Sequence, residues 1–188
     1  MEKEFREIVK ALKEAKRLDY VNDFALTGAL ALLQPRATRD MDFLISIESE
    51  KIDRFVDWLR FNKHYRLAKR HAGRPKDLIK NLIDMPTGST WADLIVAHSE
   101  VENRAIATAS MASPLKGVRL KVVRPEYLII LKLRAGSDQD YIDSAHLWNE
   151  PIDKKLVRKT AKELYMEGRI KKMLSIASRL SNRLLKKS

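Results

Sequence analysis

The sequence predicts a mixed-sheet α/β (α+β) domain over residues 1–123, followed by a C-terminal helical region over residues 124–188. Two observations support this division. Short apolar runs alternate with segments of helical spacing in the first part, whereas helical spacing alone continues after Pro125. The chain has 188 residues and 45% hydrophobic content, which is enough for one core domain with a helical appendage.

The first elements are expected to be a helix, a strand, a tight turn and a second helix. Residues 3–18 place apolar side chains at helical spacing in a charged background, which predicts an amphipathic helix packed on a sheet. Residues 23–27 form a short apolar strand that ends at Gly28. The run 29–33 then favours a helix, which Pro35 cannot continue.

Four further strands and one helix are expected before the helical region. Residues 42–47 have the unbroken apolar character of a buried strand, and residues 52–59 return to helical spacing. Residues 78–83 and 91–96 are strand candidates on either side of a turn-rich segment, which predicts a hairpin. Branched apolar residues alternate with basic ones over 118–123, which predicts the last strand.

The C-terminal region contains four segments of helical spacing, and Pro125 opens the first of them. The segments are 127–133, 141–148, 156–164 and 170–180, and the residues expected to separate them are Gly136, Pro151 and Gly168. A helical bundle is therefore expected after the sheet domain.

The charge of the chain favours a polyanionic partner. Lys and Arg outnumber Asp and Glu by 37 to 25, giving a net charge of +12. The excess is concentrated in Asp153–Ser188, with twelve basic and three acidic residues, and in Arg60–Lys80, with eight and one. Nucleic acid fits this balance, although solvated helix surfaces have a similar composition.

Several classes of protein are excluded or disfavoured by composition. The chain contains no cysteine, which excludes disulfides, thiol catalysis and cysteine-ligated zinc. The N-terminal residues lack the apolar core of a signal peptide, and no apolar run approaches the roughly 20 residues of a membrane span. We therefore expect a cytoplasmic protein with no membrane partner.

Three carboxylates are the candidate metal ligands. Asp40 and Asp42 are two residues apart, so on a strand their side chains point to the same side. Asp93 stands in a predicted neighbouring strand and is the best third ligand. Oxygen ligands suit Mg²⁺, which bridges triphosphates and lowers the pKa of an attacking hydroxyl. Each aspartate alone is also typical of a strand start, a helix cap or a turn.

Gly28 is a candidate phosphate-binding turn. A glycine between a strand and a helix lets the backbone approach a phosphate closely, and the helix N-terminus offers free N–H groups to it. An ordinary strand-to-helix turn would have the same pattern.

The strand, the Gly28 turn, the helix and the Asp40-Met-Asp42 run resemble the core motif of the polymerase-beta-type nucleotidyltransferase superfamily. Ala29 stands where that family has a second Gly or a Ser. Loss of a Ser hydroxyl removes one phosphate hydrogen bond, worth on the order of 1 to 3 kcal/mol. The segment Leu131–Asp143 is similar to a helix of the abortive-infection toxin nucleotidyltransferases and their relatives, which reads Leu-Lys-Leu-x-Ala-x-Arg-x-x-Asp-x-x-Asp. The resemblance covers residues 20–148.

The resemblance implies a nucleotidyltransferase core that moves a nucleoside monophosphate from an NTP such as ATP to an acceptor hydroxyl. Mg²⁺ or Mn²⁺ is the implied cofactor, and the implied catalytic metal ligands are Asp40, Asp42 and Asp93. Lys132 is expected to contact the nucleotide phosphates. The full set of implied nucleotide-binding residues is Gly28, Ala29, Thr38, Lys132, Asp140 and Asp143.

The partner and the activity are open to two interpretations. The charge favours RNA as the acceptor, and the resemblance suggests tRNA, a toxin activity and a cognate antitoxin protein. The alternative is a catalytically weak or inactive member of the fold that binds nucleic acid or protein, because Ala29 is atypical and fold does not imply function.

Overall fold

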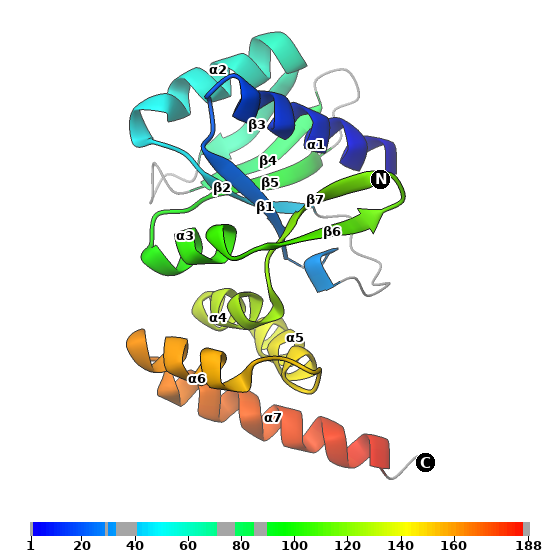
Figure 1. Cartoon of the computed structure of the whole chain (residues 1–188), viewed down its shortest axis with the longest axis vertical. Coiled ribbons are helices and arrows are strands. Elements are labelled where there is room, and N and C mark those ends of the chain that lie inside the picture. The colour runs from blue at the N-terminus through cyan, green and yellow to red at the C-terminus, as the bar shows by residue number, and fades with distance from the viewer. Residues whose placement is uncertain (1, 29, 33–40, 71–77, 85–89, 186–188) are drawn as a thin grey trace. The chain divides into compact units, whose positions relative to one another are not determined.

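The computed structural model describes residues 2–28, 30–32, 41–70, 78–84 and 90–185 (Figure 1). The chain divides into two compact units, Met1–Val123 and Arg124–Ser188, and each is described by itself. The elements, in chain order, are α1 (Glu2–Arg17), β1 (Asp23–Thr27), η1 (Leu30–Leu32), β2 (Asp42–Ser46), η2 (Ser49–Lys51), α2 (Ile52–Lys63), β3 (Tyr65–Arg70), β4 (Leu78–Asp84), β5 (Thr90–Val96), α3 (Glu100–Ala107), β6 (Ser110–Leu115), β7 (Val118–Val122), α4 (Pro125–Ala135), α5 (Asp138–Trp148), α6 (Lys154–Glu163) and α7 (Glu167–Leu185).

The first unit is built on one mixed sheet with the strand order β3-β4-β5-β2-β1-β7-β6. The central strand β2 pairs antiparallel with β1 and parallel with β5. β1 pairs parallel with β7, and the hairpin expected from β4 and β5 is confirmed by their antiparallel pairing. A mixed α/β architecture is therefore confirmed, and the parallel pairing of β2 and β5 brings two distant segments of the chain together.

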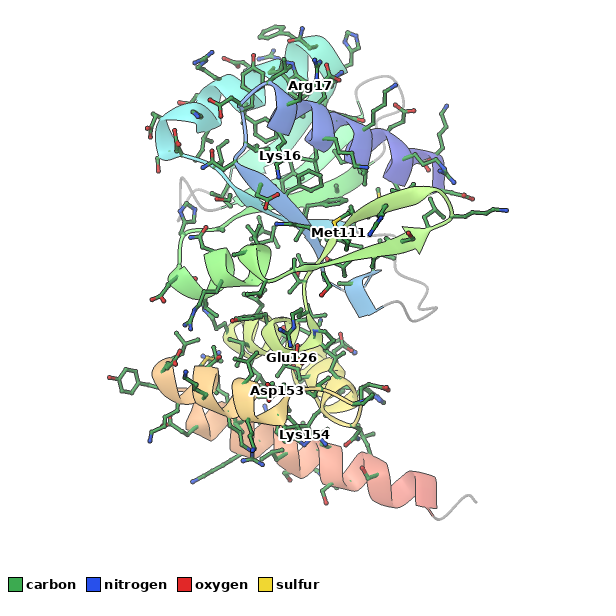
Figure 2. The ribbon with its side chains drawn as sticks, in the orientation of Figure 1. Lys16, Arg17, Met111, Glu126, Asp153 and Lys154 are labelled. Carbon is green, nitrogen blue, oxygen red and sulfur yellow. The ribbon has the colours of Figure 1, made fainter. Side chains whose placement is uncertain are left out.

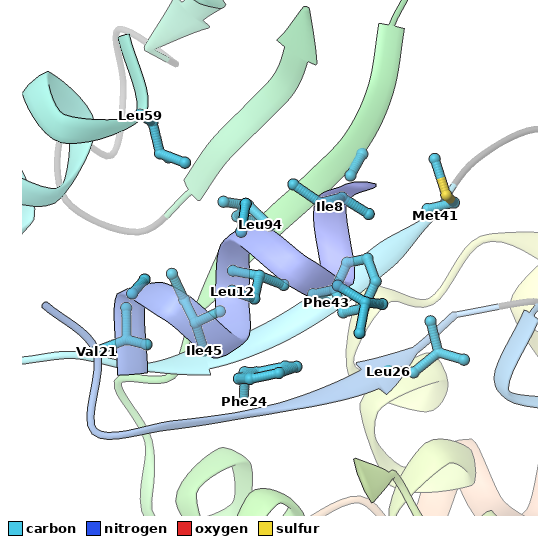
Figure 3. Close-up of a cluster of buried hydrophobic side chains, with 14 of the residues drawn as sticks. Ile8, Leu12, Val21, Phe24, Leu26, Met41, Phe43, Ile45, Leu59 and Leu94 are labelled. Carbon is cyan, nitrogen blue, oxygen red and sulfur yellow. The ribbon is translucent and has the colours of Figure 1, made fainter. Parts of the chain in front are cut away.

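The main core lies on the face of the sheet covered by α1 and α2, whereas α3 lies on the other face (Figure 1). Figure 3 shows Ile8 and Leu12 of α1 over Phe43 and Leu94, and all four side chains are fully buried. Burying one such side chain contributes about 1.5 to 3 kcal/mol. Both faces of the central strands are covered, which explains the unbroken apolar run of β2.

Three elements of the first unit do not follow from hydrophobic periodicity. β3 lies in the basic stretch, and β6 is a strand at the edge of the sheet whose side chains are partly or fully exposed. Helix α3 begins with a capping box between Ser99 and Glu102, a signal that the sequence does contain. The helix expected over residues 29–33 is described only as the 3₁₀ turn η1, because residues 29 and 33–40 lie outside the described part of the chain.

The second unit consists of the helices α4 to α7. Pro125 occupies the first turn of α4, and Gly136 ends it with φ +77°, as its position in the sequence predicts. Gly168 is a correction, because α7 already begins at Glu167 and this glycine lies in its first turn. The break occurs instead at Tyr165, which has φ +55°. None of the helices within the described residues has the length and apolar character needed to cross a bilayer.

Candidate metal site and a buried ionic cluster

Three strands of the first unit position the carboxylates of Asp42 and Asp93. Asp42 is the first residue of β2, and its Cα partner in the parallel strand β5 is Asp93. The Asp93 N–H donates to the carbonyl of Met41 at 2.8 Å, which fixes the register at this point. On the other side of β2, Asp42 is paired with the buried Thr27 at the end of β1. Parallel neighbours lie about 4.8 Å apart, so the two aspartates are adjacent in the sheet.

Asp42 and Asp93 share the face of the sheet that does not carry the main core. Side chains alternate along a strand, and register partners point to the same side. Phe43 and Leu94, the next residues along the two strands, belong to the core beside α1. The two aspartates therefore point to the opposite face, where both are partly exposed.

Gly28 lies against the carboxylate of Asp42. Its φ is +67°, a conformation that residues with a side chain rarely adopt. A Cβ added at this position would overlap the Asp42 carboxylate and come within 2.7 Å of its Cγ. Glycine is therefore required here for two separate reasons, and the backbone turn and the acidic side chain form one packed unit.

The donor set at this edge fits a hard divalent cation. Two adjacent carboxylates supply the oxygen ligands that Mg²⁺ and Mn²⁺ take, and like charges this close favour binding of a cation. Among the described residues, no group of three or more His, Asp or Glu side chains is placed to hold a metal ion. Asp40, the expected partner of Asp42 in the Asp-x-Asp pair, lies outside the described residues, as do Ala29 and Thr38.

The remaining predicted residues belong to an ionic cluster in the second unit. The ammonium of Lys132 donates to Asp143 at 2.9 Å and to Asp140 at 3.5 Å. The side chains of Lys132 and Asp143 are only 12% and 4% exposed. The cluster joins α4 to α5, so it has a structural role that accounts for all three residues. Their predicted contact with nucleotide stays a prediction.

Two further polar residues, Ser137 and Gln139, complete this cluster. Gln139 donates its side-chain amide to Asp143 at 2.7 Å, and Ser137 caps α5 in a capping box with Asp140. Both follow from spacing, because residues four apart on a helix are neighbours and Ser-x-x-Asp precedes an apolar run. Asp140 is therefore a helix-capping residue as well as a partner of Lys132.

Glu126 is a second buried carboxylate of this unit, besides Asp143, and no pattern in the sequence predicts its role. Figure 2 shows Glu126 and Asp153 in the second unit, where the Asp153 N–H donates to the Glu126 carboxylate at 2.9 Å. Burial alone would raise the pKa of Glu126. Hydrogen bonds from backbone N–H groups and the ion pair with Arg124 outweigh burial, so the pKa lies below its ordinary value of 4.5.

Comparison with known proteins gave no match, either to a model of a protein family or to a curated protein. Asp42, Asp93 and Gly28 are brought together by the sheet, and Lys132, Asp140 and Asp143 are brought together by two helices of the other unit.

Proposed function

We propose that this chain is a metal-dependent nucleotidyltransferase that moves a nucleoside monophosphate from an NTP to a hydroxyl group of RNA. The observation that carries the proposal is the pairing of Asp42 with Asp93 directly beside the Gly28 turn. A phosphate-binding turn and adjacent oxygen ligands are the two parts that nucleotidyl transfer requires. The order of these residues on β1, β2 and β5 also supports a nucleotidyltransferase core.

Each residue has a defined role in the proposed reaction. Asp40, Asp42 and Asp93 would hold the Mg²⁺ or Mn²⁺, which when bound would neutralise the triphosphate and lower the pKa of the acceptor hydroxyl. The backbone at Gly28 would approach the phosphates. The acceptor oxygen bonds to the α-phosphorus while the bond from that phosphorus to the bridging oxygen breaks. Pyrophosphate leaves, and the hydroxyl proton passes to Asp93.

The test is transfer of radioactive label to RNA. The purified chain is incubated with Mg²⁺, total RNA and each NTP labelled at the α-phosphate, with Asp42→Ala as the control. We expect label in RNA with the native chain and none with Asp42→Ala. An NTP labelled at the γ-phosphate should give no labelled RNA, because that phosphate leaves in pyrophosphate. Absence of transfer with every NTP would overturn the proposal.

A catalytically inactive module that binds nucleic acid or protein is the second candidate. The observation that favours it is Ala29 in place of a second Gly or a Ser next to the phosphate turn. The label experiment separates the two, since this candidate predicts RNA binding without transfer. A toxin role belongs to the first candidate, and it predicts growth arrest on expression that Asp42→Ala abolishes.

A further inference from the structure

The exposed surface of α6 is strongly basic. Successive residues of an α-helix are rotated by about 100° around its axis. On this basis, five cations of α6 lie within an arc of about 140° on one side of the helix. Val157, Thr160 and Ala161 occupy the buried side of the helix. We call the exposed side the α6 basic face, and its residues are Lys154, Lys155, Arg158, Lys159 and Lys162.

The cations of the α6 basic face are not used in ion pairs within the described residues. Lys154 and Arg158 lie over the ring of the buried Trp148, at 5.4 and 5.1 Å from its centroid. These cation–π contacts hold two of the five side chains in place. Arg169 is different, because it donates to the carbonyls of Leu133 and Arg134 at the end of α4. Among the described side chains of this unit, α6 therefore presents a group of five cations without an ion pair, whereas Lys172 of α7 is paired with Asp138.

An aromatic side chain follows directly at the end of α6. Tyr165 is 92% exposed, which makes it the most exposed of the large hydrophobic side chains in the described part of the chain. Its backbone closes the helix, since the Met166 N–H donates to Ala161 at 2.8 Å and the Tyr165 N–H to Lys162 at 3.1 Å. Proteins usually place Gly at this left-handed position, because a side chain there is strained. Neither burial nor helix termination explains why a tyrosine occupies it.

We propose that the α6 basic face and Tyr165 bind a single-stranded RNA segment. The cations contact consecutive phosphates, and the exposed ring of Tyr165 stacks on a base. Basic grooves with exposed aromatic rings are the common means of binding single strands, and an unpaired base is what a lone exposed ring can stack on. The inference rests on the proposed function only for the choice of RNA as the polyanion.

The experiment measures binding of a fluorescein-labelled, mixed-sequence 20-nucleotide RNA to the full chain by anisotropy, without NTP or Mg²⁺. A triple variant of the α6 basic face removes three lysines and keeps Lys154 and Arg158, the two cations that lie over Trp148. A matched triple variant removes the same charge from exposed lysines of α1. The α6 variant is Lys155→Gln, Lys159→Gln and Lys162→Gln. The matched control is Lys3→Gln, Lys10→Gln and Lys13→Gln.

We expect the α6 variant to weaken binding at least tenfold and to reduce the slope of log affinity against log salt by about 2, or roughly 0.7 per lost phosphate contact. The α1 control should weaken binding less than threefold. Equal losses in the two variants would mean that RNA responds only to net charge, and would overturn the proposal.

Tyr165 provides the second test, which separates binding from folding. Tyr165→Gly should weaken RNA binding about tenfold through loss of stacking, while raising Tm by a few degrees because glycine relieves the left-handed strain. Tyr165→Phe should bind like the native chain. The proposal would be overturned if Tyr165→Gly bound RNA as tightly as the native chain. It would also be overturned if the native chain bound phosphatidylserine vesicles more tightly than RNA.

Failure of the proposed reaction can be distinguished from failure of this inference. Asp42→Ala should bind the RNA like the native chain, because Asp42 is an acidic residue of β2 and not one of the cations of the α6 basic face. If neither the native chain nor any variant transfers label to RNA, the proposed reaction is wrong. If the α6 and Tyr165 variants still weaken RNA binding as expected, the proposed RNA-binding face is supported independently of that reaction.

Discussion

The two groups of carboxylates in this chain are assembled in different ways. Asp42 and Asp93 come from segments fifty residues apart in the sequence and meet because β2 and β5 are paired in parallel. Asp140 and Asp143 lie on one helix and surround the ammonium of Lys132. The first group places like charges side by side on a rigid sheet. The second is held by hydrogen bonds from a lysine on the neighbouring helix.

This difference indicates which group is suited to bind a ligand. The carboxylate of Asp143 is only 4% exposed and accepts hydrogen bonds from Lys132 and Gln139. Removal of either contact would leave a buried charge less well compensated, so these contacts have a structural role. Asp42 and Asp93 lie side by side on a partly exposed sheet face, and two adjacent carboxylates are a donor set that suits a divalent cation. Within its own unit, each group therefore has a different set of contacts.

The strongest test of this comparison is Lys132→Met. We expect it to lower the free energy of unfolding by about 3 to 5 kcal/mol, because it leaves the buried Asp143 without its cation. Urea unfolding of the native chain and the variant measures the change.

The double variant Lys132→Met with Asp143→Leu is the control. It should recover most of the lost stability, because the buried charge is removed along with its partner. If Lys132→Met instead left stability unchanged and abolished only label transfer, the cluster would belong to the active site and the comparison would fail.

A second test changes the glycine that packs against Asp42. Gly28→Ala should lower the free energy of unfolding by about 2 to 4 kcal/mol, from the left-handed backbone and from overlap with the carboxylate. Because the overlap displaces Asp42, label transfer should also be lost.

Gly117→Ala is the matched control for this change. Gly117 also has a positive φ, +77°, but its nearest neighbour to an added Cβ is the Arg6 guanidinium at 3.6 Å. It should therefore show the backbone strain alone, about 1 to 2 kcal/mol, with transfer intact. Equal effects of the two substitutions would show that contact with Asp42 does not matter.

Much of the fold follows from local patterns, and the exceptions have physical reasons. The apolar runs of β1, β2, β5 and β7 are covered on at least one face, so hydrophobicity marks them. β3 and β6 lie at the two edges of the sheet, and each pairs with one neighbouring strand. Edge strands need fewer buried apolar side chains, so hydrophobicity does not mark them. Gly168 was expected to separate helices, but Tyr165 takes the left-handed position three residues earlier.

The sequence predicts Asp42 and Asp93 as candidate ligands, but it does not predict the register in which their strands pair. Spacing along the chain suggests that Asp42 and Asp93 lie in neighbouring strands, yet only the pairing of β2 with β5 makes them direct partners. The contact between Gly28 and Asp42 is likewise tertiary. Lys132 in an apolar helix segment suggested an anion, and the structure supplies that anion from α5. Local sequence cannot distinguish an internal carboxylate from an external phosphate.

A smaller effect is expected when Mg²⁺ is added. If Asp42 and Asp93 hold the cation, Mg²⁺ at ten times its dissociation constant should stabilise the first unit by about 1.4 kcal/mol. Thermal unfolding with and without Mg²⁺ measures it. Asp42→Asn and Asp93→Asn should abolish the increase in Tm, whereas Asp140→Asn should retain it. The same Mg²⁺ response in all four proteins would place the cation elsewhere.

The smallest expected effect concerns Glu126, a buried carboxylate that resembles Asp143 in having only structural contacts among those described. Its pKa is lowered in the folded chain, so its stabilising contribution is complete above pH 4.5 and is lost as pH falls through the folded pKa. Glu126→Gln should therefore lower the free energy of unfolding by about 1 kcal/mol at pH 7 and by progressively less below pH 4.5. Urea unfolding across this range, with the exposed Glu150→Gln as control, tests the prediction. A difference that persists at low pH would mean that shape, rather than charge, makes Glu126 stabilising.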